Sequence, residues 1–519
     1  GKTEAGLLWI GDNKGYFTLP LRSAINSIFD RVRNKILKNK KLDERLALLH
    51  SDSLNELFNR NKSGKEDDFK LEDLEIIGYN NRARQNSLPL TITTIDQIFK
   101  FVYKYWGFEQ ELATLSYSKI VIDEIQMYSS DLLAYLVIGL DMVTKMGGKF
   151  SIITATLPPF ILDLLRERKL DFIMPVKPFY KENRIRHCMQ LRQEEINSQI
   201  IMDKYADNKI LIIVNTVRKA QEIYNELADT VDQDELRVFH GGFIKRDRKV
   251  VENEIVNFAR EGSKETGIWI CTQVAEASLD IDFDILITEL SDINGLFQRM
   301  GRCYRNRAIE EGKTNIFVFD GGPEKCSGVG FVNDKDIFTL SKNKLREKCQ
   351  NKKVWKLTEK DKIDIINEVY TTENLKDTKY YKDIHSIINY VESTFLYELS
   401  KSEVIKRFRA INNIDVIPRD IYEGNKSRIK DCIAILHEEY NADEKEKQRM
   451  QKAKARIDLA DLTVAIPFYF SNHHNTEKIK INDYESLNIY NCIYDKKFGI
   501  KHIKEEVQDT HRDYTSNII

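Results

Sequence analysis

Short apolar runs rich in β-branched residues alternate with helix-prone segments in two parts of the chain. In the first part, "SKIVID" (118–123) and "KFSIITA" (149–155) are such runs, and residues 21–37 have helical periodicity. The second set begins near residue 205 and contains "KILIIVN", "LRVFHG", "GIWICT", "FDILITE" and "NIFVFD". Strands that alternate with helices at this spacing form parallel sheets of βαβ units. The sequence therefore predicts two tandem α/β domains.

Beyond residue 326 the sequence changes character, because charged, helix-prone stretches replace the alternating pattern. One such stretch covers 444–462, and the short strands "TVAIPFYF" and "LNIYNCIYD" follow it. A chain of 519 residues has room for several domains. We predict a first α/β domain over 1–180, a second over 181–325, a helical linker region over 326–460 and a small C-terminal domain over 461–519.

The composition excludes several classes of protein. Lys and Arg total 80 and Asp and Glu total 81, so any basic track for nucleic acid must be local. The seven cysteines form no CxxC pair, which argues against a zinc module and a disulfide framework. No apolar stretch reaches the roughly 18 to 20 residues that cross a bilayer. We expect a cytoplasmic protein without membrane contact.

Two adjacent acids follow an apolar strand in "IVIDEIQMY", at the edge where α/β sheets bind ligands. Alone, Asp123 and Glu124 are more often a solvated turn. The chain also opens with "GKT", the back end of a phosphate-binding loop whose glycines and strand would precede it. Together these features favour an ATP and Mg²⁺ site. Gly1 and Lys2 would meet the phosphates, Thr3 would ligate the metal, Asp123 would hold it through water, and Glu124 would polarise the attacking water.

The segment "FQRMGRCYR" in the second predicted domain carries Gln298, Arg302 and Arg305. Two guanidinium groups on one side of a helical turn can clamp the charge of a phosphoryl group during transfer, as arginine fingers do. A surface helix with scattered basic residues is the alternative interpretation.

Polar residues also follow other predicted strands. Thr154 and Thr156 in "ITATLPP" are a hydroxyl pair or ordinary strand-end threonines. In "CTQVAEASLDIDFD", Thr272 could contact a nucleic-acid backbone and Asp280 the ribose of the nucleotide, although a simple acidic loop explains the pattern too.

These segments occur in a recognisable order: "GKTEA", "TLPLRSAINSIFDRV", "TTIDQ", "DEIQ", "TATLP", "IIVNTVRKAQEIY", "FHGGF", "TQVAEASLDIDFD" and "QRMGRCYR". The series resembles a superfamily 2 helicase, and more closely the CRISPR-associated helicase-nuclease of type I interference systems. The resemblance implies two tandem RecA-like domains and an ATP-dependent single-stranded DNA translocase that unwinds invader DNA to feed a nuclease. It also implies DNA-backbone contacts, each of which could instead be a cap or strand-end residue, at Arg22, Thr94, Asn215, Thr216 and Thr272.

The sequence departs from the family pattern in two respects. Gln126 stands where the family usually has His after the acidic pair, and the chain contains no His-Asp dipeptide of an HD nuclease. We therefore expect only the helicase portion, with the HD nuclease as a separate domain or subunit. A guide-RNA surveillance complex would supply the opened DNA.

Two alternatives remain open from the sequence. A DExH-type RNA helicase would show the same motifs, because tracking along a backbone leaves little trace of sugar preference. A nucleotide-gated nucleic-acid scaffold without turnover is the other. The histidines of "HHN" (473–475) lack ligand partners at suitable spacing, and "HRD" (511–513) lacks the Gly-rich loop and DFG of a kinase. Neither segment is therefore predicted to be a metal site or a catalytic motif.

Overall fold

The computed structural model describes residues 1–38, 42–62, 73–176, 179, 184–276, 279–408, 413–467, 476–482 and 485–501. The chain forms two compact units. The first comprises Gly1–Phe179 and Ile366–Ala410, and the second comprises Tyr180–Ile365 and Ile411–Ile519. The segments 473–475 and 511–513 lie outside the described residues.

The first unit is built on a five-stranded sheet of order β2-β3-β1-β4-β5, in which every pair of neighbours is parallel. The strands are β1 (Gly15–Thr18), β2 (Leu46–Leu49), β3 (Leu90–Thr93), β4 (Lys119–Asp123) and β5 (Lys149–Ile153). The longer helices are α1 (Lys2–Ile10), α2 (Arg22–Arg31), α4 (Ser53–Lys62), α5 (Asp73–Arg84), α7 (Phe108–Leu115), α8 (Ser130–Lys145) and α9 (Pro159–Glu167). Because the strands are parallel, their carboxyl ends form one edge.

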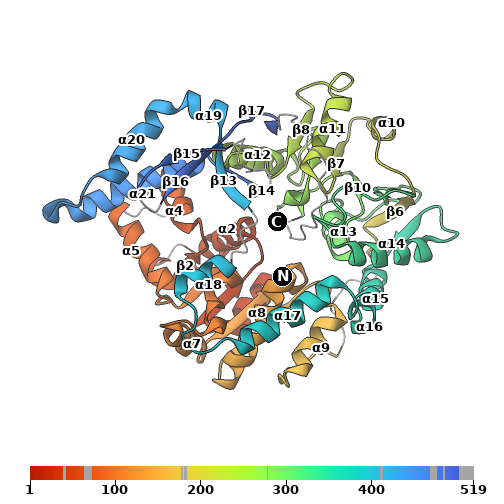
Figure 1. Cartoon of the computed structure of the whole chain (residues 1–519). Helices are drawn as coiled ribbons and strands as arrows, with labels where there is room; N and C mark the ends of the chain where they lie inside the picture. Colours follow the sequence, from red (N-terminus) through yellow and green to blue (C-terminus); the bar gives the residue numbers. More distant parts are fainter. Residues whose placement is uncertain are drawn as a thin grey trace. The chain divides into compact units, whose positions relative to one another are not determined.

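A later stretch of the chain completes this unit. It contributes α16 (Thr372–Leu375), α17 (Lys379–Ser393) and α18 (Lys401–Phe408), and α17 packs along α8 (Figure 1). The ring of Phe408 lies 4.2 Å from that of Tyr135, and the hydroxyl of Tyr103 donates to that of Tyr135 at 2.9 Å. Residues 366–408 therefore pack on the unit that contains the five-stranded sheet.

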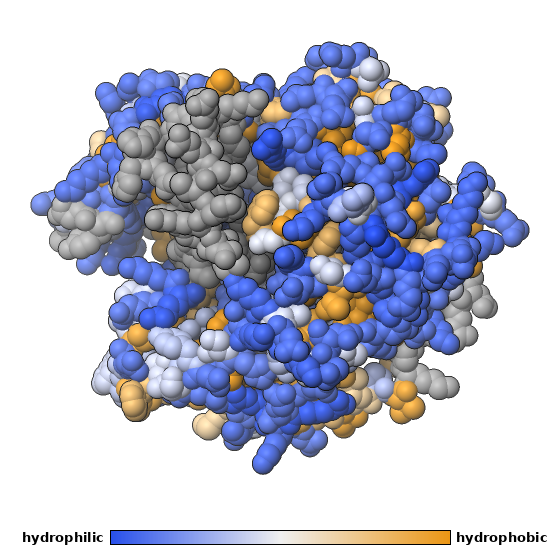
Figure 2. All heavy atoms as spheres, turned by 45° about the vertical axis from the view of Figure 1, so that its right-hand side comes forward, coloured by the Kyte–Doolittle hydropathy of each residue, from blue (hydrophilic) through white to orange (hydrophobic). Residues whose placement is uncertain are grey.

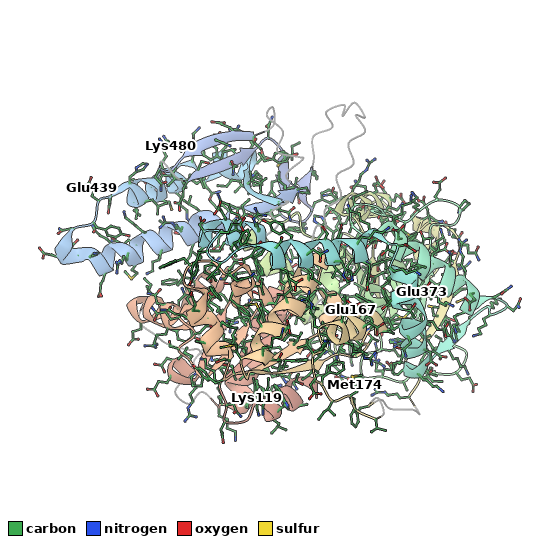
Figure 3. The ribbon with its side chains drawn as sticks, turned by 60° about the horizontal axis from the view of Figure 1, so that its bottom comes forward. Lys119, Glu167, Met174, Glu373, Glu439 and Lys480 are labelled. Carbon is green, nitrogen blue, oxygen red and sulfur yellow. The ribbon has the colours of Figure 1, made fainter. Side chains whose placement is uncertain are left out.

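Helix α1 runs antiparallel to β4. Its first residue, Lys2, reaches Glu124 just beyond the strand, while Lys119 at the start of β4 (labelled in Figure 3) donates to the carbonyl of Trp9 at 2.7 Å. The helix approaches the sheet closely at Gly6. A Cβ there would lie 2.8 Å from Phe17 and 3.1 Å from Val121, so only glycine fits without a shift of these neighbours. This contact holds the N-terminus of α1 at the carboxyl edge of the sheet.

The second unit contains a seven-stranded sheet of order β12-β6-β11-β10-β7-β9-β8, parallel except for β12. Its strands are β6 (His187–Arg192), β7 (Lys209–Ile213), β8 (Leu236–Phe239), β9 (Gly267–Cys271), β10 (Ile285–Glu289), β11 (Ile316–Phe319) and β12 (Trp355–Leu357). Its helices are α10 (Ser198–Met202), α11 (Val217–Leu227), α12 (Lys245–Phe258), α13 (Ile293–Met300), α14 (Lys335–Cys349) and the first part of α15 (Glu359–Val369).

The same unit carries a smaller mixed sheet of order β14-β13-β16-β15. It is formed by β13 (Asn413–Pro418), β14 (Val464–Pro467), β15 (Thr476–Lys480) and β16 (Ser486–Tyr490), with α19 (Arg419–Gly424), α20 (Lys426–His437) and α21 (Lys445–Asp461). A hairpin of β17 (Ile493–Asp495) and β18 (Gly499–Lys501) follows, and the amide of Ile500 donates to the carbonyl of Gly242 at 2.9 Å.

The predicted fold class is confirmed: the chain is mixed α/β with two parallel sheets, consistent with two RecA-like domains. The apolar runs quoted above coincide with β4, β5, β7, β8, β9, β10 and β11. The domain boundaries at 180, 325 and 460 stay a prediction. Each of the seven cysteines is free. The face in Figure 2 is mostly hydrophilic, and within the described ranges no helix has both the length and the apolar character to cross a bilayer.

Gly6→Val should destabilise the first unit by about 1–3 kcal/mol, because the added side chain collides with Phe17, Ile153 and Val121. Thermal unfolding followed by circular dichroism measures the effect. Gly78→Ala is the control: it lies on α5 with no atom within 4 Å of an added Cβ, and should be neutral or stabilising by up to about 1 kcal/mol. Equal effects of the two substitutions would contradict the close packing of α1.

Candidate active site

The acidic pair of the first unit sits where β4 ends. Glu124 has a φ of 49°, in the left-handed region, and its amide donates to the carbonyl of Ile153 at 3.0 Å. This turn gives the two neighbouring acids different surroundings. Asp123 is 7% exposed, whereas the side chain of Glu124 is 28% exposed. A non-glycine residue in this conformation is strained, a feature that concentrates at functional sites.

Asp123 is a buried carboxyl group with an unmet need for a partner. Its Oδ1 atom makes no hydrogen bond within the described part of the chain. Burial and the neighbouring charge of Glu124 raise the pKa of Asp123 to about 7, while Lys2 opposes the shift. A divalent cation would supply the missing positive charge, and Mg²⁺ prefers such oxygen ligands.

Lys2 and Thr3 reach the same edge from the first turn of α1. Thr3 is buried at 5% exposure, and the Nζ atom of Lys2 lies 2.6 Å from Oε1 of Glu124. The hydroxyl of Thr3 and the carboxylate of Asp123 are chemically suited to Mg²⁺. Gly1 is exposed, and its amino group donates to Oε2 of Glu4 at 2.5 Å.

A side-chain network holds Glu124 from its other side. The amide of Gln126 donates to Oε2 of Glu124 at 2.5 Å, and the hydroxyl of Thr154 lies 2.6 Å from Oε1 of Gln126. Thr154 is also within 3.4 Å of Oε2 of Glu124. Gln126 thus links the end of β4 to the residue after β5, and three separate segments meet at Glu124.

Two predicted nucleic-acid residues follow strands of the same sheet. Thr94 comes directly after β3, is 7% exposed and occupies the N-cap position of a short helical turn. Arg22 begins α2 after β1 and forms an ion pair with Asp52. Both therefore lie at the carboxyl edge that carries the acidic pair.

The second unit is organised around a buried arginine that the sequence analysis did not select. Arg299 in α13 has no exposed surface. It donates to Glu276 at 2.7 Å, to the hydroxyl of Thr288 at 3.0 Å and to Oδ1 of Asn215 at 2.8 Å. Asn215 itself donates its side-chain amide to the carbonyl of Leu290 at 3.0 Å. The side chain of Asn215 is therefore part of an internal network.

Arg302 and Arg305 lie in the turn after α13 and differ in their surroundings. Arg302 donates to the carbonyls of Leu279 and Glu276 at 2.5 and 2.6 Å. Arg305 reaches the carbonyl of Leu279 at 3.1 Å and Asp280 at 3.4 Å, and its side chain is 39% exposed. Gln298 is half-buried in α13 and Asp280 is 85% exposed.

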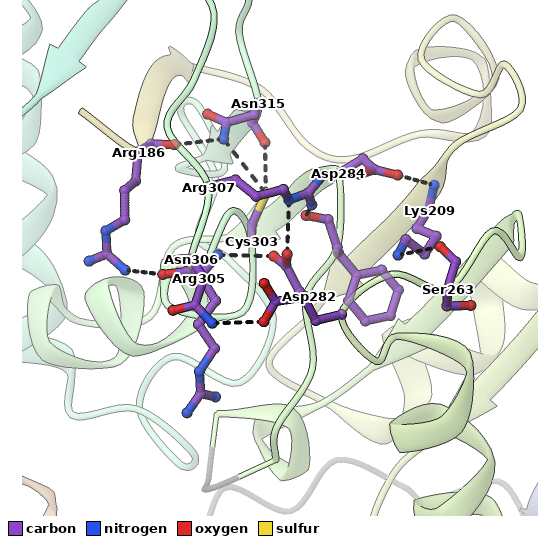
Figure 4. Close-up of polar contacts among 12 residues, drawn as sticks. Arg186, Lys209, Ser263, Asp282, Asp284, Cys303, Arg305, Asn306, Arg307 and Asn315 are labelled. Carbon is purple, nitrogen blue, oxygen red and sulfur yellow. Dashed lines mark hydrogen bonds and ion pairs between the residues drawn. The ribbon is translucent and has the colours of Figure 1, made fainter. Parts of the chain in front are cut away.

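The backbone of this turn is held more firmly than the Arg305 side chain. The amide of Arg305 donates to Asp282 at 2.9 Å, and Arg307 pairs with Asp282 and Asp284 at 2.9 and 2.8 Å. Figure 4 shows the guanidinium group of Arg305 pointing away from this cluster. The turn thus presents a partly exposed cation on a fixed backbone.

The remaining predicted residues end two strands of this sheet. Thr216 follows β7 and caps α11, accepting a hydrogen bond from the amide of Lys219 at 3.2 Å. Thr272 follows β9 and is 4% exposed. Next to it, Gln273 donates to the carbonyl of Asn215 at 2.9 Å. The structure thus groups Asn215, Thr216 and Thr272 at one edge, while all the site assignments stay predictions.

Comparison with known proteins gives consistent sequence matches. Residues 206–308 match the family "CRISPR-associated nuclease/helicase Cas3, C-terminal". The chain is 30% identical over 361 residues to a CRISPR-associated nuclease/helicase Cas3 of Methanothermobacter thermautotrophicus, covering 66% of this chain and 41% of that protein. It is 28% identical over 372 residues to the Cas3 of Streptococcus thermophilus, covering 62% and 40%. The chain thus spans about two fifths of the length of these relatives.

Solved structures share the fold at low sequence identity. Cas3 of T. fusca with AMPPNP matches with a TM-score of 0.70 and 17% identity, covering 94% of this chain and 65% of that one. A chain of a structure described as "CRISPR RNA-guided surveillance complex, pre-nicking" matches with a TM-score of 0.60 and 15% identity, covering 96% and 67%.

Asp123→Asn should stabilise the chain in the presence of EDTA and without nucleotide, more at pH 8 than at pH 5. The pKa of Asp123 is raised to about 7, which means that the folded chain binds the proton of this carboxyl group more tightly than the unfolded chain does. The stability that this tighter proton binding contributes is therefore lost as the pH rises from about 4 towards 7. At about 1.4 kcal/mol per pKa unit, the gain at pH 8 is of the order of 1–4 kcal/mol.

Thermal unfolding at the two pH values measures this difference. Asp141→Asn is the control, because the buried Asp141 already pairs with Lys145 at 2.8 Å and should give no such gain. A lower unfolding temperature of Asp123→Asn at pH 8 would show that Asp123 has a stabilising partner.

Proposed function

We propose that this chain is the helicase portion of a CRISPR-associated Cas3 protein, and that it is an ATP-driven translocase that moves along single-stranded DNA and unwinds it. The observation that carries the proposal is the meeting of Lys2, Asp123 and Glu124 at the carboxyl edge of a parallel sheet. That combination of a cation and two acids in different environments suits hydrolysis of a nucleoside triphosphate.

The residues of the first unit divide the work of hydrolysis. Lys2 would bind the β and γ phosphates with the backbone at Gly1. Thr3 and Asp123 would hold Mg²⁺, which would neutralise phosphate charge when bound. Binding of phosphate to Lys2 releases Glu124 from their 2.6 Å ion pair. Glu124 then orients the attacking water and accepts its proton.

Gln126 and Thr154 act as positioning residues for this base. Their contacts at 2.5 and 2.6 Å hold the Glu124 carboxylate after Lys2 turns to the phosphates. Gln126 would thus hold the base in place from the position where the family that the sequence resembles usually has His.

The second unit supplies charge to the transferring phosphoryl group. Arg305 is the stronger candidate for an arginine finger, because its side chain is half-exposed and its contacts are 3.1 and 3.4 Å long. Arg302 is engaged at 2.5 and 2.6 Å with two carbonyls and supports the turn, with Gln298 beside it. The exposed Asp280 would contact the ribose of the nucleotide.

DNA contacts without sequence readout fit the polar residues at the sheet edges. Arg22, Thr94, Thr216 and Thr272 offer a guanidinium group, hydroxyls and nearby backbone amides, the groups that bind phosphates. Asn215 contributes by holding the loops in place, since its side chain is bonded to Arg299 and Leu290.

The descriptions of the relatives suggest two partners, a nuclease and a guide-RNA complex. Relatives described as nuclease/helicase are more than twice as long as the aligned region, so an HD nuclease domain or subunit would receive the translocated strand. A guide-RNA surveillance complex would deliver the opened DNA, in keeping with a neighbour described as such a complex. The seven free cysteines suit a reducing cytoplasm.

The test is ATP hydrolysis by the full-length protein with single-stranded DNA or RNA of equal length and sequence. DNA should stimulate turnover at least about tenfold, and Lys2→Ala and Glu124→Gln should abolish it, because each removes a group at the phosphates. Glu167→Gln, an exposed change at the end of α9 (Figure 3), is the control. Greater stimulation by RNA would favour a DExH-type RNA helicase, and binding without turnover would favour a nucleotide-gated scaffold.

Arg305→Ala should slow DNA-stimulated hydrolysis by about 10³-fold, with a much smaller effect on ATP binding, as expected of an arginine finger. Steady-state kinetics and equilibrium binding of a fluorescent nucleotide separate the two effects. Arg260→Ala, at an exposed position of the same unit, is the control. An equal loss of binding and hydrolysis would make Arg305 a ground-state contact.

A further inference from the structure

A polar cluster with a buried centre and two partly exposed members joins the start of β6 to the first turn of α15. We call its four members, Arg186, His187, Glu359 and Lys362, the α15 cluster. His187 is 0% exposed and Lys362 is 4% exposed. The Nζ atom of Lys362 lies 3.0 Å from Nδ1 of His187 and 2.9 Å from Oε1 of Glu359. Nothing in the proposed ATP site requires these groups directly.

The hydrogen bonds of the cluster have a defined direction. Burial and the charges of Lys362 and Arg186 lower the pKa of His187, so its ring is neutral. An ammonium group only donates, so Nδ1 of His187 is the acceptor and Nε2 carries the proton. Nε2 then donates to the carbonyl of Cys303 at 3.0 Å. Lys362 therefore fixes the tautomer with which His187 holds Cys303.

The second arm of the cluster reaches the same turn. Arg186 donates through Nη2 to Glu359 at 2.6 Å. Through Nη1 it donates to the carbonyl of Arg305 at 3.2 Å, as Figure 4 shows. The two carbonyls held by the cluster flank Tyr304, whose φ of 50° is in the left-handed region. The cluster thus holds a strained turn by hydrogen bonds on both sides of Tyr304, one of them to the backbone of Arg305.

Helix α15 also crosses the division between the two units. Residues up to Ile365 belong to the second unit and residues from Ile366 to the first. The two side chains that orient Arg186 and His187 lie in the first turn of this helix, at Glu359 and Lys362. Any shift of α15 therefore acts on the carbonyls of Cys303 and Arg305.

We propose that the α15 cluster is a positioning device that couples the segment connecting the two units to the placement of Arg305, and so to ATP hydrolysis. The inference rests on the proposed role of Arg305 as an arginine finger. An apolar set of similar volume would stabilise a fold as well as a buried charged set does. The directional bonds to two carbonyls are what the charged set adds.

The test compares Lys362→Met with Lys360→Met, an exposed change two residues away on the same helix. Lys362→Met should lower kcat for DNA-stimulated hydrolysis about 2- to 30-fold, the usual range for coupling residues, and leave nucleotide affinity unchanged. Lys360→Met should leave both unchanged. Glu359→Gln, which keeps the shape of the side chain and removes its charge, should act in the same direction and decides the matter if Lys362→Met does not fold.

The double variant Lys362→Met with Arg305→Ala distinguishes coupling from a general structural effect. If the cluster acts through Arg305, the double variant should hydrolyse ATP no more slowly than Arg305→Ala alone. Multiplied effects, or wild-type kcat in both folded cluster variants while Arg305→Ala is impaired, would overturn the inference. Wild-type hydrolysis by Arg305→Ala would instead overturn the proposed finger, and the inference with it.

Discussion

The parallel pairing of β1 with β3 and β4 is the constraint on which the candidate site depends. Its register places Thr18 opposite both Thr93 and Ile122, so the chain leaves each strand at the same edge. Helix α1 packs along β4, antiparallel to it, because Gly6 allows the helix to contact the sheet closely. The first turn of α1 thereby reaches that edge. Lys2 therefore meets Glu124, although 122 positions separate them in sequence. Neither residue could form the site without the topology that joins them.

Two buried charged residues, Arg299 and Asp123, have different surroundings, and the difference follows their proposed roles. In the second unit, Arg299 is fully buried and its guanidinium group bonds to Glu276, Thr288 and Asn215. A satisfied network of this kind fixes the loops that it joins. In the first unit, Oδ1 of Asp123 lacks such a bond within the described residues, and its pKa is raised. An unsatisfied carboxyl group costs stability, and such a cost is typical of a site that awaits a ligand.

Sequence reasoning succeeded where periodicity carries the signal. The strands β4, β5 and β7 to β11 are visible in the sequence as apolar runs. By contrast, β1 (Gly15–Thr18) begins with glycine and contains no Val or Ile, and β6 includes the polar His187 and Gln190, so neither stands out as such a run. Arg299 was not selected because nothing local distinguishes it from Arg302 and Arg305. Its burial depends on Asn215, 84 positions away. Likewise, the bond from Gln126 to Glu124 is local, but the contact with Thr154 needs the neighbouring strand.

Contacts to backbone carbonyls explain how a partly exposed arginine can sit on a fixed turn. Arg302 donates to the carbonyls of Glu276 and Leu279. His187 and Arg186 donate to those of Cys303 and Arg305, and such bonds position the main chain. The Arg305 side chain keeps its own freedom, with contacts of 3.1 and 3.4 Å. Since these anchors are buried or half-buried, salt screens them less than surface ion pairs. The position of the turn after α13 therefore depends on the packing of β6 and α15. The position of the Arg305 guanidinium group depends instead on the group that it binds.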